Sequence, residues 1–356
     1  MRLLVTGAAG FVGGTFAAEA GRCGFEVLAT DRRPMPRLGG SVRTLTKELT
    51  AVGPDDLAPG IDAVVHFATG KSHYVRADVA GSARYRAVID ETVSAARHAF
   101  ALAAGAGAQR VVHISSMTVY PAPIPISCAD GVAALDPHPE RRGVYADSKI
   151  RAEQAVHELA AATPGVEACV LRLALVCGPG MGHGDARSAR NTVLRSTLVS
   201  SGKVVPPGVA VGIGRPAQAA PLLDIRDLMS GLVALLEQQP RPGAVRVWDV
   251  HTPDPPSKRA LIGAYAMASR TRVAQVWLPQ WAAMGGAWLV EGALRARGRR
   301  AHVPYRVARS YRIDPERLPV ERFWRDVGIT PRGSVASCMA LAVDDGMPEL
   351  QPARAV

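Results

Sequence analysis

Aromatic residues and cysteines are scarce in this chain of 356 residues. Aromatics make up 5% of the sequence, although 48% of it is apolar. A core of Ala, Val and Leu is typical of an α/β protein and disfavours an aromatic-rich β-sandwich. The five cysteines are widely spaced and form no Cys-x-x-Cys pair. They indicate free thiols in a reducing, cytoplasmic compartment, without a disulfide scaffold. The histidines show no ligand spacing, so we expect no metal site.

Long hydrophobic runs are also missing. The apolar start of the chain stops at Gly7, too early for a signal peptide. The most apolar later stretch, residues 277–294, is interrupted by Pro279 and Glu291, which disfavours an integral membrane span. It carries three tryptophans and is followed by four arginines. Two interpretations stay open: a helix of a substrate-binding lobe, which we favour, or a helix on a membrane surface.

Acidic residues are outnumbered, 31 against 42 Lys and Arg, and the net charge is +11. The excess is concentrated between Arg241 and Arg312, where 13 basic residues face three acidic ones. Such a surface attracts anions, or is simply a solvated basic face, which is the interpretation we favour. Helix-turn-helix and zinc-finger patterns are absent, so we expect no nucleic-acid partner.

The first half of the chain alternates short β-branched runs with Ala-rich helical stretches. This order predicts an α/β fold, a Rossmann-type doubly wound parallel sheet with right-handed crossovers. We predict an NAD(P)-binding domain over residues 1–177, with a return segment near 222–250. Residues 178–356 would mainly form a smaller, interleaved C-terminal substrate-binding lobe. Strands are expected at 2–6, 26–30, 63–67, 110–115, 168–173 and 245–250, and helices at 13–22, 91–105, 149–162 and 224–236.

A glycine motif lies between the first predicted strand and the first predicted helix. Gly7 suits a tight turn, Gly10 allows close approach of a pyrophosphate, and Gly13 lets the helix pack near the strand. The N-terminus of the helix offers free N–H groups and a positive dipole end to the anion. The motif therefore predicts a dinucleotide site.

The residues after the second predicted strand bear on the choice of cofactor. Asp31 can accept hydrogen bonds from the adenosine ribose and would repel a 2′-phosphate, which favours NAD. Arg32 and Arg33 could instead clamp that phosphate, so NADP stays open as the alternative.

A candidate catalytic set follows in chain order. Tyr145 and Lys149 are four residues apart on a predicted helix and share one face. A phenol has a reference pKa of about 10, and a nearby ammonium would stabilise the phenolate. Tyr145 could then exchange a proton with an alcohol while hydride moves to or from a nicotinamide. Ser116, at the end of a predicted strand, could hydrogen-bond the substrate oxygen.

The motifs TGAAGFVG (6–13), DAVVHFAT (62–69), HISSMTVYP (113–121) and YADSK (145–149) together resemble the extended short-chain dehydrogenase/reductases of the NAD-dependent epimerase/dehydratase family. The resemblance implies an enzyme, a homodimer, and Ser116, Tyr145 and Lys149 as its catalytic residues. It further implies that Thr118 and Lys71 contact substrate. The cofactor residues that it implies are Gly7, Gly10, Phe11, Val12, Gly13, Asp31, Arg32, Glu48, Leu49, Phe67, Ala68, Thr69, Tyr145 and Lys149.

Departures from the family pattern keep the substrate open. Leu175 stands where nucleotide-sugar enzymes usually carry Asn, and Cys177 where they carry Tyr. The helix at 88–92 also lacks the usual Asn and Gly. We expect an epimerase or ketoreductase of a nucleotide sugar. The alternatives are a 3β-hydroxysteroid dehydrogenase-like enzyme for a bulky apolar alcohol or ketone, and a non-catalytic NAD(P)-binding protein.

Overall fold

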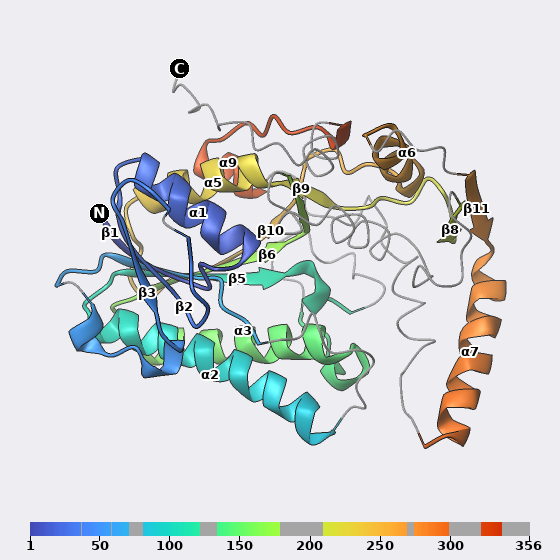
Figure 1. Cartoon of the computed structure of the whole chain (residues 1–356), viewed down its shortest axis with the longest axis horizontal. Coiled ribbons are helices and arrows are strands. Elements are labelled where there is room, and N and C mark those ends of the chain that lie inside the picture. The colour runs from blue at the N-terminus through green and yellow to red at the C-terminus, as the bar shows by residue number, and fades with distance from the viewer. Residues whose placement is uncertain are drawn as a thin grey trace.

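Seven parallel strands form the central sheet of the computed structural model, in the order β10-β6-β5-β4-β1-β2-β3 (Figure 1). The described residues are 1–36, 38–57, 59–70, 81–121, 134–178, 209–268, 274–298 and 322–336. The strands of the sheet are β1 (Arg2–Thr6), β2 (Glu26–Asp31), β3 (Val42–Thr46), β4 (Ala63–His66), β5 (Arg110–Ser116), β6 (Glu167–Leu173) and β10 (Val245–Val250).

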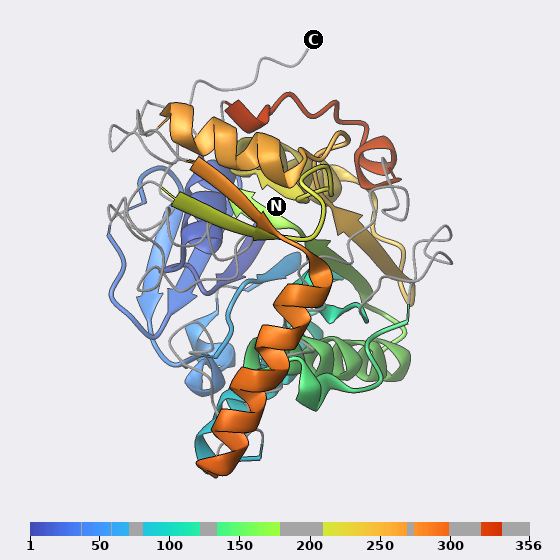
Figure 2. The same ribbon diagram turned by 90° about the vertical axis from the view of Figure 1, so that its right-hand side faces the viewer.

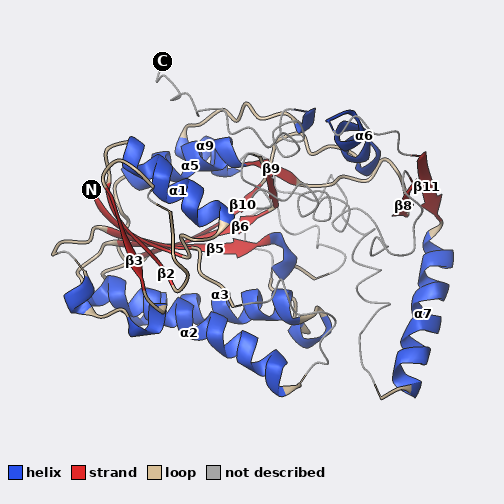
Figure 3. Cartoon of the chain, in the orientation of Figure 1, coloured by secondary structure: helices blue, strands red, loops and turns tan. Residues whose placement is uncertain are grey.

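Helices cover both faces of this sheet (Figure 3). One face carries α1 (Phe11–Arg22), α5 (Ile225–Glu237) and α9 (Arg322–Val327), and the other carries α2 (Ala83–Gly105) and α3 (Val144–Ala162). The inner strands are therefore apolar on both sides: Leu3 and Val5 pack towards α1 and α5, and Leu4 packs towards α2. The Rossmann-type doubly wound sheet predicted from the sequence is confirmed.

Two helices begin earlier than the sequence pattern predicts. The helix expected from residue 91 begins at Ala83, because Ser82 Oγ accepts a hydrogen bond from Tyr85 N at 3.1 Å and caps it. The helix expected from residue 149 begins at Val144. Tyr145 and Lys149 therefore both lie within its first two turns.

Two small parallel sheets and two helices lie beyond the carboxyl ends of the main strands. β7 (Leu175–Cys177) pairs with β9 (Leu222–Asp224), and β8 (Val209–Ile213) pairs with β11 (Ala274–Leu278). Helix α6 (Lys258–Ala268) precedes β11, and α7 (Gln280–Ala296) follows it. Figure 2 looks onto this end of the molecule, with α7 running away from β11.

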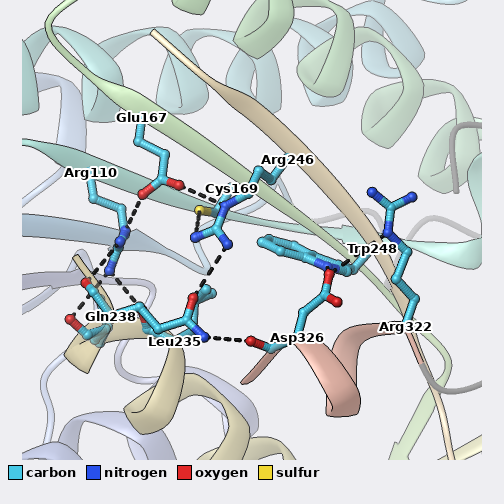
Figure 4. Close-up of polar contacts among 10 residues, drawn as sticks. Arg110, Glu167, Cys169, Leu235, Gln238, Arg246, Trp248, Arg322 and Asp326 are labelled. Atoms are coloured by element: carbon cyan, nitrogen blue, oxygen red, sulfur yellow. Dashed lines mark hydrogen bonds and ion pairs between the residues drawn. The ribbon is translucent and has the colours of Figure 1, made fainter. Parts of the chain in front are cut away.

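A buried ionic cluster joins the late part of the chain to the amino ends of the strands (Figure 4). Arg110 Nε donates to Glu167 Oε2 at 2.6 Å, and Arg246 Nε forms an ion pair with Oε1 at 2.7 Å without hydrogen-bond alignment. Arg110 also donates to the carbonyls of Leu235, Leu236 and Gln238, which closes the C-terminal end of α5. From α9, the Asp326 carboxylate accepts from Trp248 Nε1 at 2.9 Å. These contacts serve the fold, because they lie at the amino ends of the strands, whereas the candidate site lies at the carboxyl ends.

Candidate cofactor and catalytic site

The candidate site lies where the direction of strand addition reverses. From β1 the chain adds β2 and β3 on one side and β4, β5 and β6 on the other. The carboxyl ends of β1 and β4 are adjacent, since Thr6 pairs with His66. Ligands of doubly wound sheets bind at this kind of switch point. The glycine motif and Phe67 directly follow β1 and β4, and Asp31 and Ser116 are the last residues of β2 and β5, so all of them lie at the carboxyl ends of the strands.

The glycine turn leaves no room for side chains. Gly7 has a φ of +73°, and a Cβ on it would lie 2.6 Å from Ala68 N. A Cβ on Gly13 would lie 2.5 Å from the Gly7 carbonyl oxygen and so push α1 away from β1. Gly10 is the N-cap residue of α1, and Phe11 and Val12 form its first turn, both half-buried. The N-terminus of α1 is therefore open to an anion.

Asp31 and Arg32 take different partners. Asp31 Oδ2 accepts from Ala9 N at 3.1 Å, so this carboxylate supports the glycine turn. Arg32 forms an ion pair with Glu91 of α2, and its Nη1 lies 3.9 Å from Glu48 Oε2. Two carboxylates thus hold the guanidinium that could have bound a 2′-phosphate.

The segment after β4 closes the other side of the turn. Phe67 packs against Phe16 of α1 with ring centroids 5.6 Å apart, and Ala68 N donates to Thr6 Oγ1 at 3.4 Å. Thr69 Oγ1 is buried without a hydrogen-bond partner among the described residues. Leu49 is buried in the core beside Glu48, which precedes the short helix of residues 49–51.

Ser116 ends β5 and begins a tight turn. Its side chain is buried, and Oγ accepts from Thr118 N at 3.2 Å. The turn is braced by Arg142, which donates to the Thr118 carbonyl at 2.9 Å and to Asp136 at 2.7 Å. Thr118 Oγ1 finds no partner within the part of the chain that is described. Two hydroxyls, at Ser116 and Thr118, are thereby held at the same strand end.

Lys149 is buried on α3 next to the end of β5. Its Nζ donates to the Ile114 carbonyl at 2.8 Å. Burial lowers the pKa of Lys149 to about 8, although Glu153 partly offsets this by its negative charge. The ammonium is still the main form at neutral pH. Burial also lowers the pKa of His66 to about 3, with a contribution from Lys149, and lowers that of His113 well below its usual range. These stacked imidazoles, with centroids 5.4 Å apart, are therefore neutral.

Tyr145 lies one helical turn before Lys149 and is half-buried. Its turn of α3 is fixed to α2 through Asp147, whose carboxylate accepts from Tyr85 Oη at 2.8 Å and from Arg151 Nε at 2.6 Å. Ser148 Oγ donates to the Tyr145 carbonyl at 2.9 Å. The start of α3 is thus held against α2.

A chain of buried polar side chains beside β5 was not predicted from the sequence. Ser115 Oγ donates to Glu153 Oε2 at 2.6 Å, and Arg172 of β6 binds the other oxygen of this carboxylate. Arg172 also donates to Tyr120 Oη at 2.8 Å, which in turn donates to Asp249 at 2.7 Å. Burial raises the pKa of Asp249 to about 6. One signal was available: Glu153 follows Lys149 by four residues, so both face the sheet.

The described residues fit a dinucleotide. The glycine turn brings the N-terminus of α1 close to the segment after β4, and the unpartnered Thr69 hydroxyl in that segment is available as a hydrogen-bond partner. Lys71, expected to contact substrate, lies outside the described residues.

Within the described ranges, no group of three or more His, Cys, Asp or Glu side chains could hold a metal ion. Cys23, Cys169 and Cys177 form no disulfide, and no helix described is long and apolar enough to cross a membrane.

Lys149→Met is expected to stabilise the fold. The pKa of about 8 lies below the value of 10.5 for an exposed lysine, so the unfolded chain binds the proton more tightly. At pH 7 this mismatch costs about 3 kcal/mol, partly offset by the bond to Ile114, and we expect a net gain of about 1–2 kcal/mol. The gain should shrink as pH rises from about 8 towards 10.5, where Lys149 is neutral in both states.

Urea denaturation at two pH values measures this change, and Lys47→Met is the control. Lys47 is 37% exposed and pairs with Asp56 at 2.6 Å, so its replacement should cost up to about 1 kcal/mol. If Lys149→Met instead lowers the unfolding free energy at pH 7, the contacts of the buried ammonium outweigh its cost of desolvation, and the prediction is wrong.

Comparison with known proteins assigns the family. Residues 3–248 match the NAD dependent epimerase/dehydratase family. The chain belongs to this family, and it is an NAD-dependent enzyme of the extended short-chain dehydrogenase/reductase type. The expectations of family, enzyme and NAD cofactor are thereby confirmed. No curated protein matches the sequence.

Solved structures share the fold over nearly the whole chain. MoeE5 in complex with UDP-glucose and NAD has a TM-score of 0.65 at 22% identity, covering 96% of this chain and 97% of that one. UDP-glucose 4-epimerase from Bifidobacterium longum, in complex with NAD⁺ and UDP, has a TM-score of 0.69 at 17% identity, with 96% and 97% covered. TunA, an NAD dependent-NDP-hexosamine 5,6-dehydratase, has a TM-score of 0.65 at 22% identity, with 96% of each chain covered.

Proposed function

We propose that this enzyme moves hydride between NAD and a secondary alcohol or ketone carbon of a nucleotide sugar, as an epimerase or a ketoreductase. The observation that carries the proposal is the buried Lys149, bound to the Ile114 carbonyl of the strand that ends in Ser116, with Tyr145 one turn earlier. When bound, NAD⁺ would accept the hydride and NADH would donate it. NAD is favoured over NADP because Arg32 is already engaged by Glu91 and Glu48.

The placement of the residues supports the following roles. The Lys149 ammonium favours the phenolate of Tyr145, which takes the alcohol proton on oxidation and returns it on reduction. Ser116 Oγ donates to the substrate oxygen, and Thr118 contacts the substrate beside it. The glycine turn and the N-terminus of α1 hold the pyrophosphate. Residues beyond 178 supply most of the substrate-binding lobe.

Nucleotide sugars are the substrate class that the comparisons favour. MoeE5 and the epimerase from Bifidobacterium longum are complexes with UDP-glucose and with UDP, and both cover nearly all of this chain. The strongly basic segment from residue 241 onward would suit a diphosphate. Dehydration is disfavoured, because Met117 and Thr118 follow the catalytic hydroxyl where a 4,6-dehydratase needs a carboxylate.

One observation favours a second candidate, an enzyme for a bulky apolar alcohol. Leu175 begins β7 at the position where nucleotide-sugar enzymes usually carry Asn, and it is half-buried. An aliphatic side chain there offers no hydrogen bond to a sugar. The two candidates differ in whether a nucleoside diphosphate contributes to binding.

Thermal denaturation with saturating NAD, alone and with UDP, dTDP or GDP, tests the proposal. A ligand at a hundredfold excess over its Kd adds about 2.7 kcal/mol to the unfolding free energy, which raises Tm measurably. We expect at least one of the three nucleotides to raise Tm beyond NAD alone. Inorganic diphosphate controls for simple attraction to the basic surface. If none of the nucleotides adds to NAD, the apolar alcohol becomes the better candidate.

A further inference from the structure

Helix α7 exposes its largest apolar side chains, and the apolar residues that it buries are two alanines. Trp281 is 78% exposed, Trp288 58% and Leu289 77%, whereas Ala283 and Ala287 are buried. A helix that packs only to complete a substrate lobe would show the reverse arrangement. Trp281, Gly285, Trp288 and Gly292 recur at spacings of four and three, so they share one face.

This outward strip of α7 carries no charge between residues 281 and 294. The single acid of the helix, Glu291, is 2% exposed and accepts from Arg295 Nε at 3.2 Å. The exposed charges are all positive and all at the C-terminal end, at Arg295 and Arg297. The sequence continues with Arg299 and Arg300, which lie outside the described residues.

The placement of α7 leaves the strip accessible. The helix leads directly from β11 and lies at the end of the molecule farthest from β1, β2 and β3 (Figures 1 and 2). β11 adds Val276 and Leu278 to the exposed apolar side chains. With 17 residues the helix is about 25 Å long, enough to lie along a membrane surface but, at this length and with its arginines, not built to cross one.

We propose that α7 binds peripherally to an anionic phospholipid surface. Trp281, Trp288 and Leu289 enter the boundary between headgroups and acyl chains, where tryptophan is favoured. Arg295 and Arg297 contact lipid phosphates at the end of the helix. A second copy of the chain is the less suitable occupant, because residues 274–298 expose no acid that could face these arginines.

Cosedimentation of the full chain with phospholipid vesicles tests the proposal. The protein is expected to sediment with vesicles of mixed phosphatidylglycerol and phosphatidylcholine, and much less with phosphatidylcholine alone. Replacing Trp281, Trp288 and Leu289 together by Ser should weaken binding by about tenfold or more. Arg295→Gln with Arg297→Gln should reduce the preference for anionic vesicles, as should added salt.

Met267→Ser is the matched control, since Met267 is an exposed apolar side chain of α6, and it should bind vesicles like the unaltered protein. All variants should keep their NAD affinity, because α7 is remote from the glycine turn. The proposal is overturned if the unaltered chain does not bind anionic vesicles, or if the triple variant binds them equally well. A triple variant that instead converts a dimer into a monomer, without vesicle binding by either form, would also overturn it.

Discussion

Tyr145→Phe is expected to lower kcat by about 10²- to 10⁴-fold while the affinity for NAD stays nearly unchanged. The substitution removes only the phenolic oxygen and keeps the half-buried aromatic ring in the first turn of α3. Proton exchange with the substrate oxygen then has no acid or base, although the glycine turn and Asp31 are intact. NADH absorbance with an accepted substrate measures turnover, and calorimetric titration measures NAD affinity.

Tyr85→Phe is the matched control for this prediction. It removes a buried phenolic oxygen that donates to Asp147 at 2.8 Å, and it should cost about 1 kcal/mol of stability. Most of the turnover should remain, because Tyr85 lies on α2 and exchanges no proton with substrate. Full activity in Tyr145→Phe would contradict the role of Tyr145 as the general acid and base of the reaction.

Glu167→Gln is expected to lower the unfolding free energy by about 3–5 kcal/mol. Glu167 is fully buried between Arg110 and Arg246, whose Nε atoms lie 2.6 and 2.7 Å from its two oxygens. A neutral amide leaves the Arg110 guanidinium, itself 2% exposed, without a counter-charge. Because the cluster lies at the amino ends of the strands, the folded variant should keep its affinity for NAD.

Glu158→Gln provides the comparison on the surface. Glu158 pairs with Arg97 at 2.8 Å, and the two side chains are 65% and 50% exposed. Its replacement should cost no more than about 1 kcal/mol. Chemical denaturation of both variants measures the difference, and similar losses in the two would mean that Glu167 is better solvated than its burial indicates.

The central sheet was predictable because its strands are buried on both faces. Strands such as β1 and β4 are continuous apolar runs bounded by glycine or polar residues, and a parallel sheet produces this pattern. The edge strand β3, by contrast, is Val-Arg-Thr-Leu-Thr with three of five residues exposed, so it carries no such signal. The start of α2 was missed because Ser82 and the polar residues that follow look like a loop until the cap bond is seen.

Only those parts of the candidate site that consist of residues close together in the sequence were predictable. The glycine turn and the Tyr145–Lys149 pair each depend on positions within a few residues of one another. The Glu153–Arg172–Tyr120–Asp249 chain joins residues up to 129 positions apart, and no local pattern reveals such partners. The Arg32–Glu91 pair was missed for the same reason, because it links the end of β2 to the middle of α2.

The attachment of α5, β10 and α9 to the sheet has a consequence for synthesis on the ribosome. β6 has β10 as its neighbour on one side, and Arg110 donates to carbonyls at the end of α5, and both of these elements come after residue 224 in the chain. A nascent chain that ends near residue 178 would present an open edge of β6, and its Arg110 would have Glu167 as a partner but lack the carbonyls of residues 235–238. The central sheet therefore cannot be completed until β10 has been translated, and the edge of β6 stays exposed to wrong pairing until then.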